Sequence, residues 1–235
     1  MIKPIPLDIH EGQIAHHRER ERAAGRKEIE DDRALEALVS AGAKMRKNAE
    51  TAREMAEAIS ADKTIAGVTY RQRYADDTAK LEAIAAKRMD EAMNAVLGEI
   101  GRLSKTITPA TPSDKHLASE IRATLARLPE KEREEQLARA SDTVIEALAA
   151  APAFVTRMSD AALEHRIKSW QVSKFPDEVA RLRRLGNALN AAREVSVSFK
   201  GYVAELASTM AQPIIERSVK RTEAAKEAVT AAIAE

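Results

Sequence analysis

The sequence has no cysteine, no long uncharged apolar run and few aromatic residues: one Trp, three Tyr and three Phe in 235 residues. The lack of cysteine excludes disulfides, thiolate zinc sites and cysteine nucleophiles. Few aromatics disfavour a deep small-molecule pocket, because aromatic side chains supply much of the buried area of such pockets. The amino-terminal residues also lack the apolar core of a signal peptide. We therefore expect no membrane span and synthesis in the cytoplasm.

An excess of charge of one sign is also missing. The chain has 38 Lys and Arg against 37 Asp and Glu, a formal net charge of +1, and the two signs are mixed along its length. A protein that binds duplex nucleic acid needs a concentrated positive face. The charge balance therefore argues against nucleic acid as the main partner.

Motifs that carry chemistry are absent from the sequence as well. It has no Gly-rich phosphate loop and no nucleophile elbow of the Gly-x-Ser-x-Gly type. Its five histidines lack the His-x-x-x-His or Glu-x-x-His spacing of helical metal sites. Glu164 and His165 are adjacent, so on a helix they diverge by about 100° and are expected to be solvated. We expect no catalytic, cofactor or metal residues, and hence no enzyme.

The abundant residue is alanine, which makes up about a fifth of the chain. Alanine is the best helix former, and the β-branched and aromatic residues that favour strands are scarce. The composition predicts an all-α fold, and the periodicity and prolines divide it into about seven or eight helices. We expect an elongated helical bundle with coiled-coil-like seams and an extended amino-terminal arm.

Residues 1–10 form the predicted arm, because two prolines in this segment fix φ and prevent a helix. Its apolar side chains are Ile2, Ile5, Leu7 and Ile9. An apolar arm needs a surface to cover it. Two interpretations remain open: the arm packs on its own domain, or it docks on a neighbouring subunit.

Residues 11–108 are predicted to form an amino-terminal helical hairpin or bundle. A helical pattern to about residue 60, interrupted near Gly25 or Asp31, contains a seven-residue repeat. Its members are Leu35, Leu38, Gly42, Met45, Ala49, Ala52, Ala56 and Ile59. After a turn at 61–69, a helix over 69–104 has an apolar stripe made of Tyr70, Tyr74, Leu81, Ala85, Met89, Ala92, Val96, Ile100 and Leu103. Gly98 and Gly101 in this helix predict close contact with another helix.

Residues 109–212 are predicted to form a second, carboxyl-terminal bundle after the Pro-containing linker 106–115. Ser113 is the expected N-cap of a short helix with Leu117, Ile121, Leu125 and Leu128 inward. One helix should then run from Pro129 to about Ala150. Pro152 ends it, Phe154 should be buried in the corner that follows, and Ser159 should cap the next helix.

Pro176 then begins a long helix whose stripe steps by three and four residues. The stripe consists of Leu182, Leu185, Leu189, Ala192, Ser196, Phe199, Val203, Leu206 and Met210. Arg181, Arg183 and Arg184 are expected to form a small solvated basic patch.

Residues 213–235 are predicted to form a terminal helix, kinked or restarted at Pro213. Its apolar residues are Ile215, Val219, Val229 and Ile233, with alanine between them. Because alanine buries little area, we expect this helix to pack on another subunit or a partner.

The stretch "LARLPEKEREEQLARASDTVIEALAAAPAFVTRMSDAAL", residues 125–163, resembles a pattern in uncharacterised alanine-rich helical proteins encoded by phages and prophages of alphaproteobacteria. The shared features are a Leu-Pro helix start, an Ala-Pro-aromatic corner and a capped short helix. The resemblance covers about a sixth of the chain and implies a phage-encoded protein, without catalytic residues to transfer.

The sequence thus favours a non-enzymatic structural or assembly protein that forms homo-oligomers or binds other phage structural proteins. A virion component or a scaffold would fit, which adds the virion as a location. The alternative is a helical adaptor or regulator that binds a host or phage protein. The expected contact residues are the apolar side chains of the arm and of the terminal helix.

Overall fold

A computed structural model describes residues 2–16, 33–62 and 65–234, with the backbone alone at 65–68, 72, 212–223 and 225–234. These residues contain no strand, which confirms the all-α fold. Besides a helical turn at 12–16, the helices are α2 (Arg33–Ala61), α3 (Ile65–Ile107), α4 (Lys115–Arg127), α5 (Glu130–Ala138), α6 (Asp142–Ala149), the 3-10 helix η2 (Ala153–Thr156), α7 (Asp160–Lys174) and α8 (Pro176–Ala234).

The chain forms two compact units that differ from the predicted division. Unit 1 comprises Met1–Glu99 and Arg184–Glu235, and unit 2 comprises Ile100–Arg183. Residues 184–212, which the sequence analysis grouped with 109–183, therefore belong with the amino-terminal helices. The reason is that the apolar stripe of α8 packs in the same core as α2.

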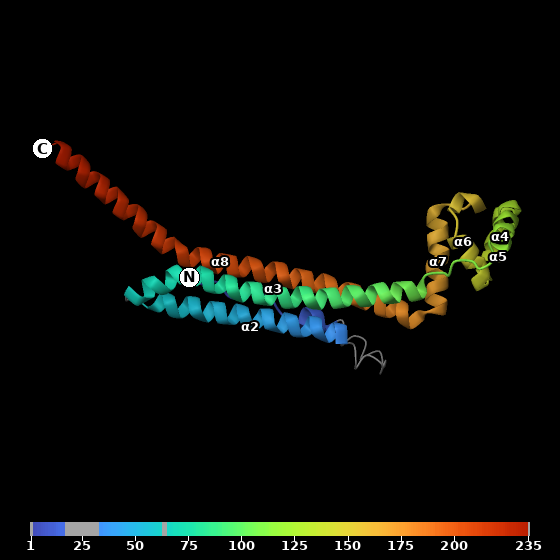
Figure 1. The fold of residues 1–235 in the computed structure, drawn as a ribbon, viewed down its shortest axis with the longest axis horizontal. Coiled ribbons are helices and arrows are strands. Elements are labelled where there is room, and N and C mark those ends of the chain that lie inside the picture. Colours follow the sequence, from blue (N-terminus) through green and yellow to red (C-terminus); the bar gives the residue numbers. More distant parts are fainter. Residues whose placement is uncertain (1, 17–32, 63–64, 235) are drawn as a thin grey trace. The chain divides into compact units, whose positions relative to one another are not determined.

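In unit 1, α2, α3 and α8 lie side by side (Figure 1). The amide Nδ2 of Asn48 in α2 donates to the carbonyl oxygen of Leu81 in α3, at 3.1 Å. The Tyr74 hydroxyl in α3 donates in the same way to the carbonyl oxygen of Ala52 in α2. The later residue of α2 thus contacts the earlier residue of α3, so these two helices are antiparallel. The Ser196 hydroxyl lies 3.9 Å from Met45 Sδ, and Met210 Sδ lies 3.7 Å from the Ser60 hydroxyl, so α8 runs parallel to α2.

The seven-residue repeat of α2 is confirmed as the buried face of this helix. All its predicted members are buried except Ile59, which is partly exposed. On α3 the stripe from Tyr74 to Leu103 is buried or half-buried, but Tyr70 is 57% exposed. The helix also begins earlier than predicted, because Ile65 is already helical and the expected turn at 61–69 is shorter.

The stripe of α8 is likewise confirmed. Its members are buried or half-buried, and Phe199 is fully buried. Pro213 does not end the helix, which continues to Ala234. In Figure 1 α8 bends in its red part, which contains this proline. A bend is expected there, because proline removes a backbone donor and its ring clashes with the preceding turn.

The core of unit 2 consists of Leu125, Leu137, Ile145 and Leu148. Partly buried side chains around it include Ile121, Leu128, Met158, Leu163 and Trp170. The single helix predicted over 129–150 is wrong, because the chain is not helical between Ala138 and Asp142. This break turns α6 so that Ile145 and Leu148 can reach the core.

Two details at the start of α4 also differ from the prediction. The N-cap is Asp114 rather than Ser113, and its carboxylate accepts from the backbone N–H groups of His116 and Leu117. Leu117 is 43% exposed, while its neighbour Ala118 is buried. The cap one residue later begins the helix at Lys115 and places the alanine on the inward side.

The corner after α6 is present, but Phe154 is not buried in it. Its side chain is 77% exposed, and Ala153 and Thr156 face inward instead. The chain turns through η2 and a left-handed residue, Arg157, with φ 55°. Ser159 caps α7 as predicted, accepting a hydrogen bond from the backbone N–H of Ala162 at 3.2 Å.

Candidate interaction surface

The arm lies on unit 1 and is held there by polar contacts. The Tyr202 hydroxyl in α8 donates to the carbonyl oxygen of Lys3 at 3.1 Å. The Lys3 ammonium forms an ion pair with Glu205, and Arg46 of α2 donates to the carbonyl oxygen of Ile9 at 3.3 Å. Burial raises the pKa of Tyr202, which keeps its hydroxyl a neutral donor. The arm is therefore anchored to both α2 and α8.

The four apolar side chains of the arm have different surroundings. Ile9 is fully buried in its own chain, so it is not free to contact a partner as predicted. Ile2 and Ile5 are half-buried, whereas Leu7 is 85% exposed. Of the two interpretations of the arm, packing on its own domain describes Ile9, and Leu7 is the side chain left to meet another molecule.

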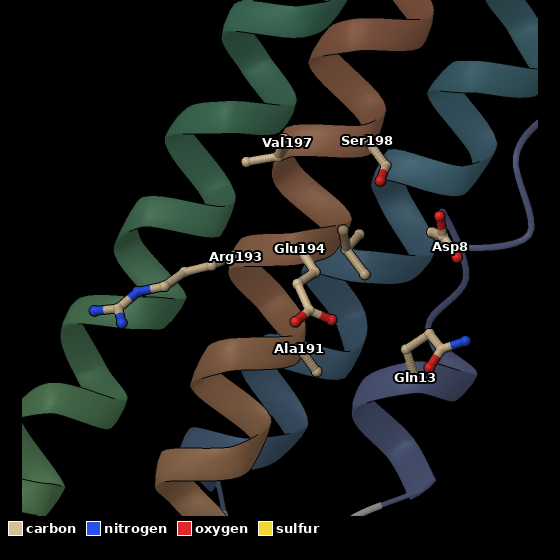
Figure 2. Close-up of a pocket in the computed structure, with 8 residues that line it drawn as sticks. Asp8, Gln13, Ala191, Arg193, Glu194, Val197 and Ser198 are labelled. Carbon is tan, nitrogen blue, oxygen red and sulfur yellow. The ribbon is translucent and has the colours of Figure 1, made fainter.

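A groove of about 450 Å³ runs beside the arm along α8. Its lining residues are Asp8, Gln13, Ala191, Arg193, Glu194, Val195, Val197 and Ser198. Figure 2 shows α8 between the arm and α3, with Arg193 and Val197 on the α3 side and Asp8 on the arm side. Val197 is 71% exposed although it lies on a helix whose other large apolar side chains are mostly buried.

The groove contains charges of both signs. Asp8 and Glu194 are exposed carboxylates that form no ion pair with the residues the structure describes. Arg193 donates a hydrogen bond of 3.4 Å to the side-chain oxygen of Asn190, one turn earlier on α8. The geometry offers a shallow groove with an aliphatic side chain, two acids and one base, which suits a protein surface better than a small substrate.

The other predicted contact residues lie on the terminal helix. The side chains of Ile215, Val219, Val229 and Ile233 are outside the described residues, so their contacts stay a prediction. The backbone there is helical, as expected.

The structure brings no catalytic cluster together in the part of the chain it describes. No group of three His, Asp or Glu side chains there is placed to hold a metal ion. Glu164 and His165 are exposed on α7, and Glu164 forms an ion pair with Lys168 at 2.6 Å. This pairing lowers the pKa of Glu164. The Glu-His pair therefore belongs to a solvated helix face, as predicted.

The predicted basic patch is not a single surface. Arg183 is exposed, Arg181 is half-buried, and Arg184 is buried with 9% exposure. Arg184 belongs to the inward side of α8, next to Leu185, so the three guanidinium groups do not share one face.

Among the described residues, no helix is long and apolar enough to cross a membrane.

Sequence reasoning missed the groove residues of α8. Val197 was a detectable signal, because it is a large aliphatic residue at an outward position between the inward Ser196 and Phe199. Asp8 gave no signal, since its place beside α8 depends on a contact between residues almost 200 positions apart.

Comparisons with known proteins add no relative. No protein-family model, no curated protein and no solved structure matches this chain.

Proposed function

We propose that this chain is a non-enzymatic structural or assembly protein that self-associates. The observation that carries the proposal is two exposed aliphatic side chains of unit 1, Leu7 on the arm and Val197 in the lining of the groove on α8. Removing exposed apolar side chains from water is favourable, so a second copy that covers them would be stabilised. The arm that presents Leu7 is already anchored, so a contact there costs little ordering entropy.

A finer role within a phage particle, as virion component or scaffold, is supported by the resemblance of residues 125–163 and by the helical composition. The partners would then be further copies of this chain and other phage structural proteins. Mass spectrometry of particles from a strain that encodes this chain tests this role. Stoichiometric amounts support a virion component, and presence only in immature particles supports a scaffold.

Self-association itself is tested by the mass of the purified protein in light scattering coupled to gel filtration. The expected result is a mass that is a multiple of 25.7 kDa and rises with concentration. A mass of one chain at every concentration would contradict the proposal.

A second candidate is a helical adaptor that binds another protein through unit 2. The observation in its favour is Phe154, whose ring is exposed on η2, beside α4 with its exposed Leu117. Exposed aromatics are frequent anchors in protein interfaces. A monomer that loses one specific partner on Phe154→Ser substitution would favour this function over self-assembly.

A further inference from the structure

We propose that His10 is a pH-sensitive switch in the amino-terminal arm, in which the ring nitrogen Nδ1 has a different partner in each charge state. In the neutral ring Nδ1 holds the backbone N–H of Gly12, and in the charged ring it pairs with the carboxylate of Glu11. Every contact used below lies within unit 1. The inference therefore does not depend on the proposed self-association.

His10 acts as a cap at the start of the helical turn at 12–16. Its carbonyl oxygen accepts from the N–H of Gln13 at 3.1 Å, and its Nδ1 accepts from the N–H of Gly12 at 2.8 Å. A side chain that satisfies one of the first N–H groups of a helix normally carries an oxygen acceptor, as in Ser, Asp or Asn. Here a titratable nitrogen takes that place, so the cap depends on the charge of the ring.

The contact also depends on the glycine at position 12. A Cβ atom added there would lie 2.7 Å from Nδ1 of His10, a distance at which the ring would have to shift. Because Nδ1 accepts a hydrogen bond, it must have a free lone pair, so the proton of the neutral ring is on Nε2. The geometry therefore selects one charge state and one tautomer of His10.

The charged ring cannot keep this hydrogen bond. Both nitrogens of a charged histidine carry protons, so Nδ1 becomes a donor and no longer accepts from Gly12. A positive charge at the start of a helix is also unfavourable because of the helix dipole. The side chain of His10 is 54% exposed, so protons reach it from the solvent.

A partner for the charged ring is already in place. The Oε2 atom of Glu11 lies 3.8 Å from Nδ1, and it is buried without accepting a hydrogen bond from the described residues. A buried carboxylate oxygen without a donor is unfavourable, so a proton on Nδ1 would satisfy it. The two contacts exclude each other at a single atom, which gives the switch two discrete states.

Other titratable or charged side chains come from the arm and from the two helices beside it. They are Asp8 and His16 on the same segment, Arg46 and Glu50 of α2, and Arg193 and Glu194 of α8. Arg46 forms an ion pair with Glu50 at 2.9 Å. Of the described charged side chains, Glu11 is the one within ion-pair distance of His10, so it decides where the charged ring turns.

The turn that His10 caps carries one of the anchors of the arm. Ile14 is fully buried, and its Cδ1 lies 3.0 Å from the position of a Cβ atom on Gly42 of α2. Ile9, directly before His10, is fully buried as well. Loss of the Gly12 contact therefore loosens the segment between two buried side chains. The arm is held at His10 at neutral pH and loosened there in the acidic range, where histidine gains its charge.

NMR of the ring nitrogens in the full chain tests the neutral state. At about pH 8, His10 should carry its proton on Nε2 and leave Nδ1 unprotonated. A neutral His10 with the proton on Nδ1 would overturn the proposal, because that nitrogen could not accept from Gly12.

Hydrogen exchange of the backbone amides of Gly12, Gln13 and Ile14 tests the switch. Their protection, relative to a free amide at the same pH, should fall by about fivefold between about pH 8 and pH 5, as for the loss of a helix cap. His10→Asn keeps a capping oxygen that does not titrate, so its protection should stay within about twofold. His116→Asn, at an exposed histidine of α4, is the matched control and should retain the fall of the natural chain.

Two results would overturn the proposal: protection in the natural chain that does not change with pH, or an equal fall in His10→Asn, which would assign the pH dependence to another group. Gly12→Ala is an independent variant, because its methyl group displaces the ring. It should lose the pH dependence whatever its level of protection, and a retained fivefold fall would contradict the role of this contact. Circular dichroism of each variant shows whether the helices remain folded.

Discussion

The Lys174 ammonium donates a hydrogen bond of 2.5 Å to the carboxylate of Asp142, which joins the end of α7 to the start of α6. The same ammonium lies 5.1 Å from the centroid of the Trp170 ring, and the indole N–H donates to the other carboxylate oxygen at 2.8 Å. Asp142 is in a first helical turn and Lys174 in a last one, so each charge also suits its helix dipole. This contact links two short helices, of which α7 has no fully buried side chain.

The first prediction concerns the pH dependence of stability through Asp142. Hydrogen bonds from Lys174 and then Trp170 hold the pKa of this carboxyl below its ordinary value. A carboxyl with a lowered folded-state pKa adds stability that is complete above the unfolded-state pKa of about 4, and this stability is lost as pH falls through the folded-state value.

Asp142→Asn should therefore lower the free energy of unfolding at neutral pH and reduce its decline below about pH 4. Urea unfolding measured over that range, by the signal of Trp170, provides the comparison. Asp90→Asn, on the exposed side of α3, is the matched control. Parallel acid curves for the natural chain and Asp142→Asn would show that this contact does not contribute.

The second prediction concerns the buried hydroxyl of Tyr74. It donates a hydrogen bond of 2.7 Å to the carbonyl oxygen of Ala52, and burial raises the pKa of the phenol. Tyr74→Phe removes this hydrogen bond between α3 and α2 inside the core and should cost about 0.5–1.5 kcal/mol of unfolding free energy. Tyr70→Phe, one turn earlier and 57% exposed, should change it by less than about 0.5 kcal/mol. Equal effects of the two changes would contradict this role.

The third prediction concerns the corner after α6. Phe154→Ala should change the unfolding free energy by less than about 0.5 kcal/mol, because the ring is already in solvent. Leu148→Ala, at a core side chain 2% exposed, should cost about 2–5 kcal/mol. Chemical denaturation of both variants checks this order. A large loss from Phe154→Ala would mean that the ring is covered in solution.

The fourth prediction concerns the terminal part of α8. Truncation after Pro213 removes Ile215, Val219, Val229 and Ile233 but keeps the buried stripe, which reaches Met210. The shortened chain should keep a similar melting temperature and assemble more weakly. Calorimetry and light scattering measure the two properties. A truncated chain that is unfolded and monomeric would place this helix in the core of its own chain.

The sequence was informative where one long helix buries one face. In α2 and α8 the steps of three and four residues identify the buried side chains, from Leu35 to Ala56 and from Leu185 to Met210. In such helices the period alone decides which residues face the core. Prolines were equally informative at helix starts, as at Pro176.

The sequence was less informative in the short helices of unit 2. Its hydrophobicity predicts Phe154 to be buried, but in the 3-10 turn before the left-handed Arg157 the neighbouring Ala153 faces inward instead. The break before α6 had one signal, Ser141 followed by Asp142, which is a typical helix start.

The candidate site was predictable only in part, because contacts between distant parts of the chain decide which of its side chains are exposed. Leu7 follows from the arm sequence, but its exposure and the burial of Ile9 depend on where Arg46 and Tyr202 hold the backbone of the arm. Those contacts join residues far apart in the chain. No local pattern records them.

The last prediction concerns Gly98, which the sequence analysis placed in a close helix contact. A Cβ atom added there would meet no atom within 4 Å, and the same holds for Gly101. Both are exposed on α3, so the glycines cost helix propensity without allowing a close approach within the described chain. Gly98→Ala should therefore raise the unfolding free energy by roughly 0.5–1 kcal/mol.

Gly42 in α2 provides the matched control, because its added Cβ would lie 3.0 Å from Cδ1 of Ile14 and 3.5 Å from the Glu11 Cα. Gly42→Ala should gain less stability than Gly98→Ala, since Ile14 must shift to admit the methyl group. Urea unfolding of the two variants measures this difference, and light scattering should show an unchanged assembly for Gly98→Ala. If Gly98→Ala weakens assembly instead, this glycine lies against a second copy of the chain.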